Sequence, residues 1–507
     1  MTEDAQAQRP LLRELAPWLA IALAFRLVFL LAMPRVIDSP DAMHYLKVAK
    51  QFSEGDFLHF YERIPLLYPA LCALAGFATG DLEWAGRIVS LTASVLLIVP
   101  IYCWSRSLHG RRVAWLAALI VAIWPWLADY GCRVAPEALA SLLWFSAVWA
   151  FARCLRTGRG WLVSAPLLFF ALHLTRPEGT FLMLAAPVGG LLLIDKDKRG
   201  TVRRLLIFVA ISAALLALYA VFMRMAIGRP TITGRVPSVD AGFRHLIFER
   251  GPQLAQTFTK MLGEVIPVML GPYLLLFAGV GLFRPVVPGG DQDTPTRDVR
   301  LELLLVYFCA VQWTLAVLST YAEPRYLMPV IIAVSLWSAR GLVLVAGQAR
   351  ALPAGRLLVR LPAAGVVCLM LFGAAVAVAP PYFGRLSREP YEYKLTGKWM
   401  KENLEPALVL TRQPQIGFYA GMATTGPARD DTPEQALSRA REAGARYLVV
   451  DERYIPTKCP GLASLLDPHN APNGLRLLKD DISPYANGRV VVYEVLPADK
   501  HAGPTAP

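Results

Sequence analysis

The run Leu205–Met223, LLIFVAISAALLALYAVFM, decides the fold, because it carries no charged residue over a length that can cross a lipid bilayer. A membrane-spanning helix needs about 20 predominantly apolar residues. Similar runs recur along most of the chain, and we predict about eleven spans of this kind: Leu15–Met33, Ile88–Trp104, Val113–Asp129, Glu137–Ala152, Trp161–Leu174, Thr180–Ile194, Leu205–Met223, Val265–Phe283, Leu303–Leu318, Tyr326–Leu344 and Leu361–Ala379. The sequence therefore predicts a polytopic α-helical membrane protein.

Composition agrees with a membrane protein and excludes several other classes. Of the 507 residues, 55% are hydrophobic and only 18% are charged, whereas a soluble domain carries about 25% charged residues. Seven cysteines in a chain of this length are too few for a disulfide scaffold. A net charge of +13 would suggest nucleic acid binding in a soluble protein. Here the basic residues lie in loops that orient spans, so we expect membrane lipids and no nucleic acid as partners.

The distribution of lysine and arginine predicts the orientation, because short cytoplasmic loops are enriched in both residues. With the N-terminus inside, most of them fall on the cytoplasmic side: Arg106, Arg111, Arg112, Arg153, Arg156, Arg159, Lys196, Lys198, Arg199, Arg203, Arg204, Arg340, Arg350, Arg356 and Arg360. The short outer turns hold one arginine each, namely Arg133, Arg176 and Arg325. We expect the shorter apolar run Leu66–Ala78 to lie at the outer interface, since a span there would reverse every later loop. Arg26, inside the first span, either snorkels to the surface or faces the bundle.

Two domains are predicted. Residues 1–380 form the transmembrane domain, which includes a first outer loop at 34–87, and residues 381–507 form a soluble domain outside. In this tail, Ala407–Thr411, Tyr447–Asp451 and Val490–Val495 have the pattern of buried strands. Thr432, Pro433 and Gln435 stand where the N-cap, first-turn proline and N3 residue of a helix are expected. The tail therefore predicts a small α/β domain.

The first outer loop carries two acidic residues just past the first span, Asp38 and Asp41, followed by His44 and Tyr45. A carboxylate at the edge of an apolar site can act as a general base, and this makes both acids catalytic candidates. The simpler explanation is that Asp41 only complements the dipole of a helix that begins here. His44 could assist a metal, but no residues show the spacing of metal ligands, so participation of a divalent cation stays open.

The same loop ends with Tyr61-Glu62-Arg63 before an apolar segment. An acid beside a base at this place can serve a charged lipid head group, which makes Glu62 a catalytic and Arg63 a phosphate-binding candidate. Both side chains could equally be interfacial anchors, and the two interpretations stay open.

Three outer turns pair an arginine with a glutamate: Arg133 precedes Glu137, Arg176 precedes Glu178, and Glu323 precedes Arg325 and Tyr326. A single pair of this kind is often a structural salt bridge. Arginine, however, is the preferred ligand for phosphate, because its planar guanidinium binds two oxygens at once. If the three turns converge at one face, they would hold a lipid-linked phosphate or diphosphate.

The ordered combination of these features resembles the GT-C glycosyltransferases. It consists of an N-in bundle of spans, the acidic first outer loop, Arg-Pro-Glu-Gly at 176–179 and Pro-Arg-Tyr-Leu-Met-Pro at 324–329. The closest branch is the bacterial family 39 set, which includes lipid A aminoarabinose transferases, Rgt-type lipopolysaccharide core transferases and relatives of protein O-mannosyltransferases. The resemblance covers most of Leu11–Pro380, and the tail is similar to the periplasmic domains of this set.

The resemblance implies a transferase that moves a hexosyl or pentosyl group from a polyprenyl-phosphate donor to a hydroxyl of a lipid, glycan or protein acceptor. The reaction would take place with inversion, at the outer face of a bacterial inner membrane, and Asp41 matches the family's acceptor-side acid. The chain departs from the family at Ala42, where relatives often have a second acid, and at Arg63-Ile64, where the aminoarabinose branch has lysine. Alternatives are a lipid or polysaccharide flippase, a lipid-linked glycan polymerase or ligase, and a structural scaffold. The chain shows no internal repeat, which disfavours a transporter.

Overall fold

The fold is described from a computed structural model. It describes residues 2–32, 36–37, 39–58, 64–158, 160–194, 197–228, 230–231, 251–283, 298–319, 323–351, 389–482 and 488–497. The chain divides into two compact units. One consists of Met1–Ala32 and Tyr45–Tyr382, and the other consists of Met33–His44 and Phe383–Pro507. Each unit is treated by itself below.

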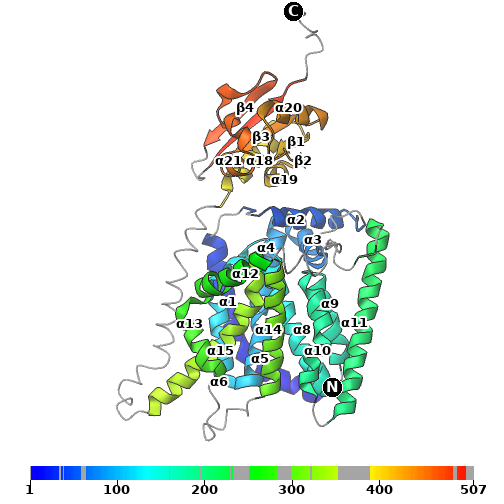
Figure 1. The fold of residues 1–507 in the computed structure, drawn as a ribbon, viewed down its shortest axis with the longest axis vertical. Coiled ribbons are helices and arrows are strands. Elements are labelled where there is room, and N and C mark those ends of the chain that lie inside the picture. Colours follow the sequence, from blue (N-terminus) through cyan, green and yellow to red (C-terminus); the bar gives the residue numbers. More distant parts are fainter. Residues whose placement is uncertain are drawn as a thin grey trace, which may run out of the picture. The chain divides into compact units, whose positions relative to one another are not determined.

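The first unit is a bundle of helices (Figure 1). Its elements are α1 (Thr2–Ala32), α2 (Pro40–Ser53, which begins in the second unit), α3 (Leu67–Thr79), α4 (Leu82–Leu96), α5 (Ile98–His109), α6 (Arg111–Ala122), α7 (Pro125–Cys132), α8 (Glu137–Thr157), α9 (Trp161–His173), α10 (Glu178–Gly190), the 3₁₀ turn η1 (Leu191–Leu193), α11 (Lys198–Ile227), α12 (Gly251–Lys260), the π-helical segment η3 (Met261–Val265), α13 (Ile266–Phe283), α14 (Val299–Leu318) and α15 (Pro324–Ala351). Large apolar residues form the core where these helices meet, with Trp144, Phe151 and Phe308 among them.

The described helices confirm a polytopic membrane fold but not the predicted number of spans. Six helices are long and apolar enough to cross a bilayer, and the number rises to eight if each of two bent helix pairs is one span. The predicted spans Trp161–Leu174 and Thr180–Ile194 coincide with the shorter apolar helices α9 and α10. Leu66–Ala78 forms α3, and its place at the membrane surface stays a prediction. The predicted span Leu361–Ala379 lies outside the described residues.

Arg26 stabilises a break in one span. Helices α6 and α7 meet at an angle of 54°, and the last carbonyls of α6 have no partner within that helix. The Arg26 side chain is completely buried, and it donates to the carbonyl oxygens of Ala122 at 2.7 Å and Val121 at 3.3 Å. Its Nε donates to Ser94 Oγ at 2.6 Å. Arg26 therefore faces the bundle and does not snorkel, and it caps α6 where the chain turns.

We expect Arg26→Met to destabilise the fold, because two helix-end carbonyls and Ser94 would lose their charged donor. Hydrogen bonds to a charged group contribute about 1.5–3 kcal/mol each, so the free energy of unfolding should fall by about 3 kcal/mol or more. Chemical unfolding in mixed micelles measures this change. Arg26→Lys keeps the charge but not the planar guanidinium group, so its free energy of unfolding should lie between those of the native chain and Arg26→Met. A methionine variant as stable as the native chain would contradict the capping role.

Helices α13 and α15 cross at unusually close range, which fixes the position of α15. A Cβ atom at Gly281 would collide with the carbonyl oxygen of Trp337, and one at Gly341 would collide with that of Phe277. Only glycine permits the two backbones to approach in this way. The crossing holds the helix whose first turn carries Arg325 and Tyr326.

The second unit contains the small sheet that the sequence predicts. Its elements are α18 (Tyr391–Asn403), β1 (Val409–Thr411), α19 (Pro414–Ala420), β2 (Thr424–Thr425), α20 (Pro433–Glu442), β3 (Tyr447–Asp451), α21 (Ile455–Lys458), the 3₁₀ turns η4 (Pro460–Leu466) and η5 (Pro468–Asn470), β4 (Leu475–Ile482) and β5 (Arg489–Val495). The strand order is β2-β1-β3-β5-β4. Strands β1, β2 and β3 are parallel, whereas β5 is antiparallel to both β3 and β4.

The local sequence patterns in this unit predicted three of its strands and the start of one helix correctly. The predicted strands became β1, β3 and β5, and α20 begins with a complete capping box between Thr432 and Gln435. The edge strand β4 was missed because its sequence, LRLLKDDI, does not alternate and carries charges. The two-residue strand β2 was too short to give any pattern.

Candidate active site

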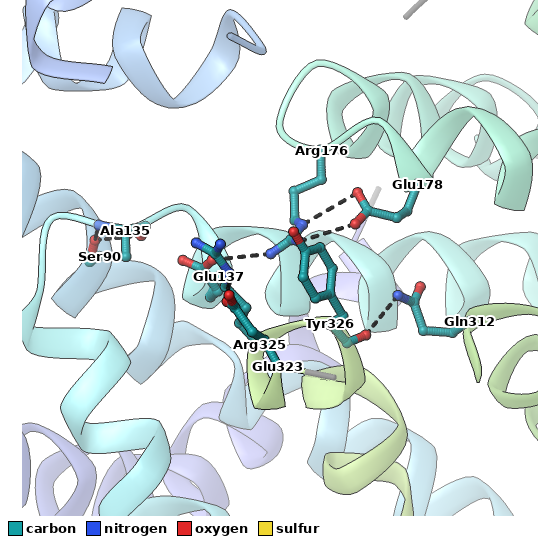
Figure 2. A network of polar contacts seen from close by, with 9 residues as sticks. All are labelled: Ser90, Ala135, Glu137, Arg176, Glu178, Gln312, Glu323, Arg325 and Tyr326. Atoms are coloured by element: carbon teal, nitrogen blue, oxygen red, sulfur yellow. Dashed lines mark hydrogen bonds and ion pairs between the residues drawn. The ribbon is translucent and has the colours of Figure 1, made fainter. Parts of the chain in front are cut away.

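Arg176 lies at the centre of a polar cluster formed by three turns of the first unit (Figure 2). Its Nη2 contacts Glu178 Oε1 at 3.0 Å, and its Nη1 contacts Glu137 Oε1 at 3.1 Å. The guanidinium carbon lies 5.0 Å from the centre of the Tyr326 ring. Glu137 begins α8, Arg176 lies between α9 and α10, Glu178 begins α10, and Tyr326 lies in the first turn of α15. One arginine thus joins three segments that are distant in sequence.

The surroundings keep Arg176 charged. Burial alone would lower the pKa of this guanidinium, but the carboxylates of Glu178 and Glu137 more than offset that effect and raise the pKa above its ordinary value. Tyr45 on α2 adds to the same electrostatic stabilisation. The side chain is only 15% exposed, so its charge acts where water screens it weakly.

Arg325 also lies near the ring of Tyr326. Its guanidinium carbon is 5.4 Å from the centre of the Tyr326 ring, and its Nε is 2.6 Å from Glu323 Oε2. The Arg325 side chain is 26% exposed and that of Glu323 is 49% exposed. A pair this open is held weakly, so Arg325 can exchange its carboxylate for another anion more readily than Arg176 can.

Neighbouring helices hold each of the three turns in place. On α4, Arg87 donates to the Cys132 carbonyl at 3.1 Å and Ser90 donates to the Ala135 carbonyl at 2.9 Å, just before Glu137. The amide of Leu67 donates to the Leu174 carbonyl at 2.8 Å, which connects α3 to the turn that carries Arg176.

Two further contacts complete this framework. Gln312 Nε2, on α14, donates to the Tyr326 carbonyl at 3.0 Å, and this bond is drawn in Figure 2. The turn at Arg176 is so tight that a Cβ at Gly179 would overlap the backbone of His173. The cluster is therefore held by contacts outside the charged groups themselves, as a preorganised site requires.

A cavity opens beside this cluster. Glu137, Arg176, Glu178 and Arg325 lie on its wall. Farther along α8, Ser141 and Trp144 also line it, and so does Gln312 from α14. Charged groups and neutral polar groups therefore share one cavity within a helical bundle.

The remaining candidates lie elsewhere or have other partners. Arg133 is nearly buried, with its Nε 2.5 Å from Asp129 Oδ1, and it is not among the residues that line the cavity. In the second unit, Asp41 is exposed in the first turn of α2, which Ser39 caps through the amide of Ala42 at 3.3 Å. His44 is half-buried on the same helix. Asp38, Glu62 and Arg63 lie outside the described residues.

Tyr45, on α2, packs against α3. It is half-buried, and its ring packs edge-on against Tyr68 of α3 with centroids 5.5 Å apart. Among the described residues, no group of three or more histidine, cysteine, aspartate or glutamate side chains could hold a metal ion.

Sequence reasoning missed Gln312, Ser141 and Trp144. A signal existed for each of them. Gln312 is a polar residue inside the apolar run Leu303–Leu318, and Ser141 and Trp144 follow Glu137 by four and seven residues, which places all three on one face of a helix.

Comparison with known proteins agrees with this fold. Residues 64–223 match the family model described as dolichyl-phosphate-mannose-protein mannosyltransferase. No curated protein matches the chain. Among solved structures, ArnT from Cupriavidus metallidurans bound to undecaprenyl phosphate aligns with a TM-score of 0.59 at 15% identity, covering 95% of this chain and 98% of that one.

Two other solved structures share the fold. The oligosaccharyltransferase of Archaeoglobus fulgidus has a TM-score of 0.58 at 14% identity and covers 86% of this chain and 69% of that one. The mycobacterial arabinofuranosyltransferase AftD has a TM-score of 0.54 at 16% identity and covers 96% of this chain and 40% of that one. All of these are GT-C glycosyltransferases. The predicted resemblance is confirmed, and the chain has the multi-pass membrane fold of these enzymes.

Proposed function

We propose that this chain, with its GT-C fold, transfers a sugar from a polyprenyl-phosphate donor to an acceptor hydroxyl at the outer face of a bacterial inner membrane. The acceptor would be a lipid, a glycan or a protein. The observation that carries the proposal is the cavity bordered by Arg176 and Arg325, whose guanidinium carbons lie 5.0 Å and 5.4 Å from the centre of the Tyr326 ring. Such an arrangement suits a phosphate group presented from a membrane lipid.

The two arginines would contribute to phosphate binding in different ways. Arg176 already contacts two carboxylates, whereas Arg325 contacts the half-exposed Glu323. The donor phosphate would displace Glu323 from Arg325 and use Arg176 as a second, less mobile cation. Arg63 and Arg133 remain further candidates, and Arg133 would act from outside the cavity wall. Held in this way, the phosphate is stabilised as negative charge develops on it during departure.

The chemical step would be one displacement at the anomeric carbon. The acceptor oxygen forms a bond to this carbon while the bond to the phosphate oxygen breaks, and the polyprenyl phosphate leaves with the bonding electron pair. The acceptor proton passes to a carboxylate, for which Asp41 is the first candidate and Asp38 and Glu62 are the others. A single displacement inverts the anomeric centre.

Transfer of a labelled sugar tests the function directly. Purified protein in proteoliposomes should move the label from a polyprenyl-phosphate sugar to an acceptor from the cell envelope. A flippase would instead carry the labelled lipid between leaflets without breaking the glycosidic bond. A polymerase or ligase would produce chains or transfer whole glycans, and a scaffold would do none of these.

The proposal also predicts the topology of the chain. Because the charge pattern predicts that the C-terminal tail lies outside the cytoplasm, alkaline phosphatase fused after Pro390 should be active in cells. A fusion after Arg199, in a predicted inner loop, should be inactive and serves as the control. An inactive fusion after Pro390 would place the tail in the cytoplasm, and the outer-face site would have to be abandoned.

A further inference from the structure

Two buried polar groups line the cavity beyond the charged cluster without any partner in the described part of the chain. They are the hydroxyl of Ser141 and the indole Nε1 of Trp144, and each side chain is only 1% exposed. Both belong to α8 and lie one and two turns beyond Glu137. Glu137, Ser141 and Trp144 thus form a polar line along one face of the helix, from the cavity mouth inward.

A buried donor without a partner is costly, at about 1–3 kcal/mol for each group, and such groups are uncommon in folded proteins. Serine in a helix usually avoids this cost by bonding to a carbonyl of the preceding turn. Ser107 bonds to the Cys103 carbonyl at 2.8 Å and Ser338 to the Val334 carbonyl at 3.0 Å. Ser141 does not do so, although it lies in the same kind of helix.

The chemistry of the inner wall differs from that of the mouth. The mouth carries guanidinium and carboxylate groups, whereas Ser141, Trp144 and Gln312 are neutral. An indole N–H needs an acceptor oxygen, and a hydroxyl can donate and accept. A polyprenyl tail offers neither, and a phosphate would be better placed at the arginines. A sugar ring, with several hydroxyl groups, matches the neutral donors.

We infer that Ser141 and Trp144 form the sugar-recognition subsite of the cavity and bond to hydroxyl groups of the sugar on the donor lipid. Gln312 would take part as a third neutral group, since its Nε2 is already engaged with the Tyr326 carbonyl and its amide oxygen is an acceptor. This inference rests on the proposed function, because it assumes that the phosphate of the same lipid occupies the mouth. Ser141 and Trp144 would then distinguish the sugar-bearing donor lipid from the polyprenyl phosphate that remains after transfer.

The test compares two kinds of lipid on the full-length protein in nanodiscs. One is undecaprenyl phosphate, and the other is undecaprenyl phosphate bearing mannose, glucose or arabinose, taking the sugar that the native protein binds best. Ser141→Ala and Trp144→Phe should each weaken binding of the sugar-bearing lipid by roughly 2–10-fold, the loss of one neutral hydrogen bond. Binding of undecaprenyl phosphate itself should stay within about twofold of the native value.

Ser105→Ala is the matched control, because the Ser105 hydroxyl is also buried and has no partner among the described residues, but does not line the cavity. This variant should bind both lipids as the native protein does. Equal weakening of both lipids by Ser141→Ala and Trp144→Phe, or no weakening of either, would overturn the sugar subsite while leaving the proposed function standing. A native protein that binds neither lipid would overturn the proposed function and the subsite together. Ser141→Ala decides the question if Trp144→Phe does not fold.

Discussion

Sugar transfer by Asp41→Asn is expected to be about 10²–10⁴-fold slower than transfer by the native protein, which is the usual contribution of a general base. Asparagine keeps the size of the side chain but cannot take the proton from the hydroxyl group of the acceptor substrate. Donor binding should be unchanged, because the arginines are untouched. Single-turnover transfer of a radiolabelled sugar, with a parallel measurement of lipid binding, separates the two effects.

Asp38→Asn is the internal control for this prediction. Asp38 does not belong to α2, the helix that carries Asp41, so its substitution should have the smaller effect. A larger loss in Asp38→Asn would move the base to that residue. Native rates in both variants, with folded protein confirmed, would remove the first outer loop from the proton transfer.

The second large loss of transfer is expected when the arginines that bind the donor phosphate are substituted. Arg325→Lys and Arg176→Lys should each lower transfer by roughly tenfold to a hundredfold, which corresponds to the loss of one charge-assisted hydrogen bond. Lysine keeps the charge but cannot bind two oxygens in one plane. The measurement is the transfer rate at limiting donor, together with the dissociation constant of undecaprenyl phosphate. Arg133→Lys provides a comparison at a residue off the cavity wall, and a full loss there would extend the phosphate site to it.

Glu323→Gln distinguishes a binding role of Arg325 from a structural one. If Glu323 only occupies Arg325 until the phosphate arrives, neutralising it removes a competitor, and donor affinity should rise by a few-fold. If the pair is a structural salt bridge, then Glu323→Gln and Arg325→Lys should instead impair folding and transfer together. Native transfer rates and lipid binding in Arg325→Lys, Arg176→Lys and Arg133→Lys would remove all three arginines from the phosphate site.

Much of the fold was accessible from the sequence, because its signals are local. Leu205–Met223 lies within the 30-residue helix α11, since an apolar run of that length must satisfy its backbone groups internally within a membrane. The Thr432–Gln435 capping box and the strand Tyr447–Asp451 were equally local. Prediction failed where the local pattern was ambiguous. The charged edge strand β4 was missed. The apolar runs at α9 and α10 form helices of 13 residues each, and their crossing of the membrane stays a prediction.

The sequence by itself determined the class of protein, the residue types at the outer turns and the resemblance to the GT-C enzymes. Tertiary structure alone decided which of these residues meet. Glu137 and Arg176 are 39 positions apart and belong to different turns, and Arg26 caps carbonyls 95 and 96 positions away. Apolar periodicity and caps act over one or two turns of chain, so they leave a signal in a single sequence. Pairing between distant side chains depends on how whole helices pack, as at the Gly281–Gly341 crossing, and no local pattern records it.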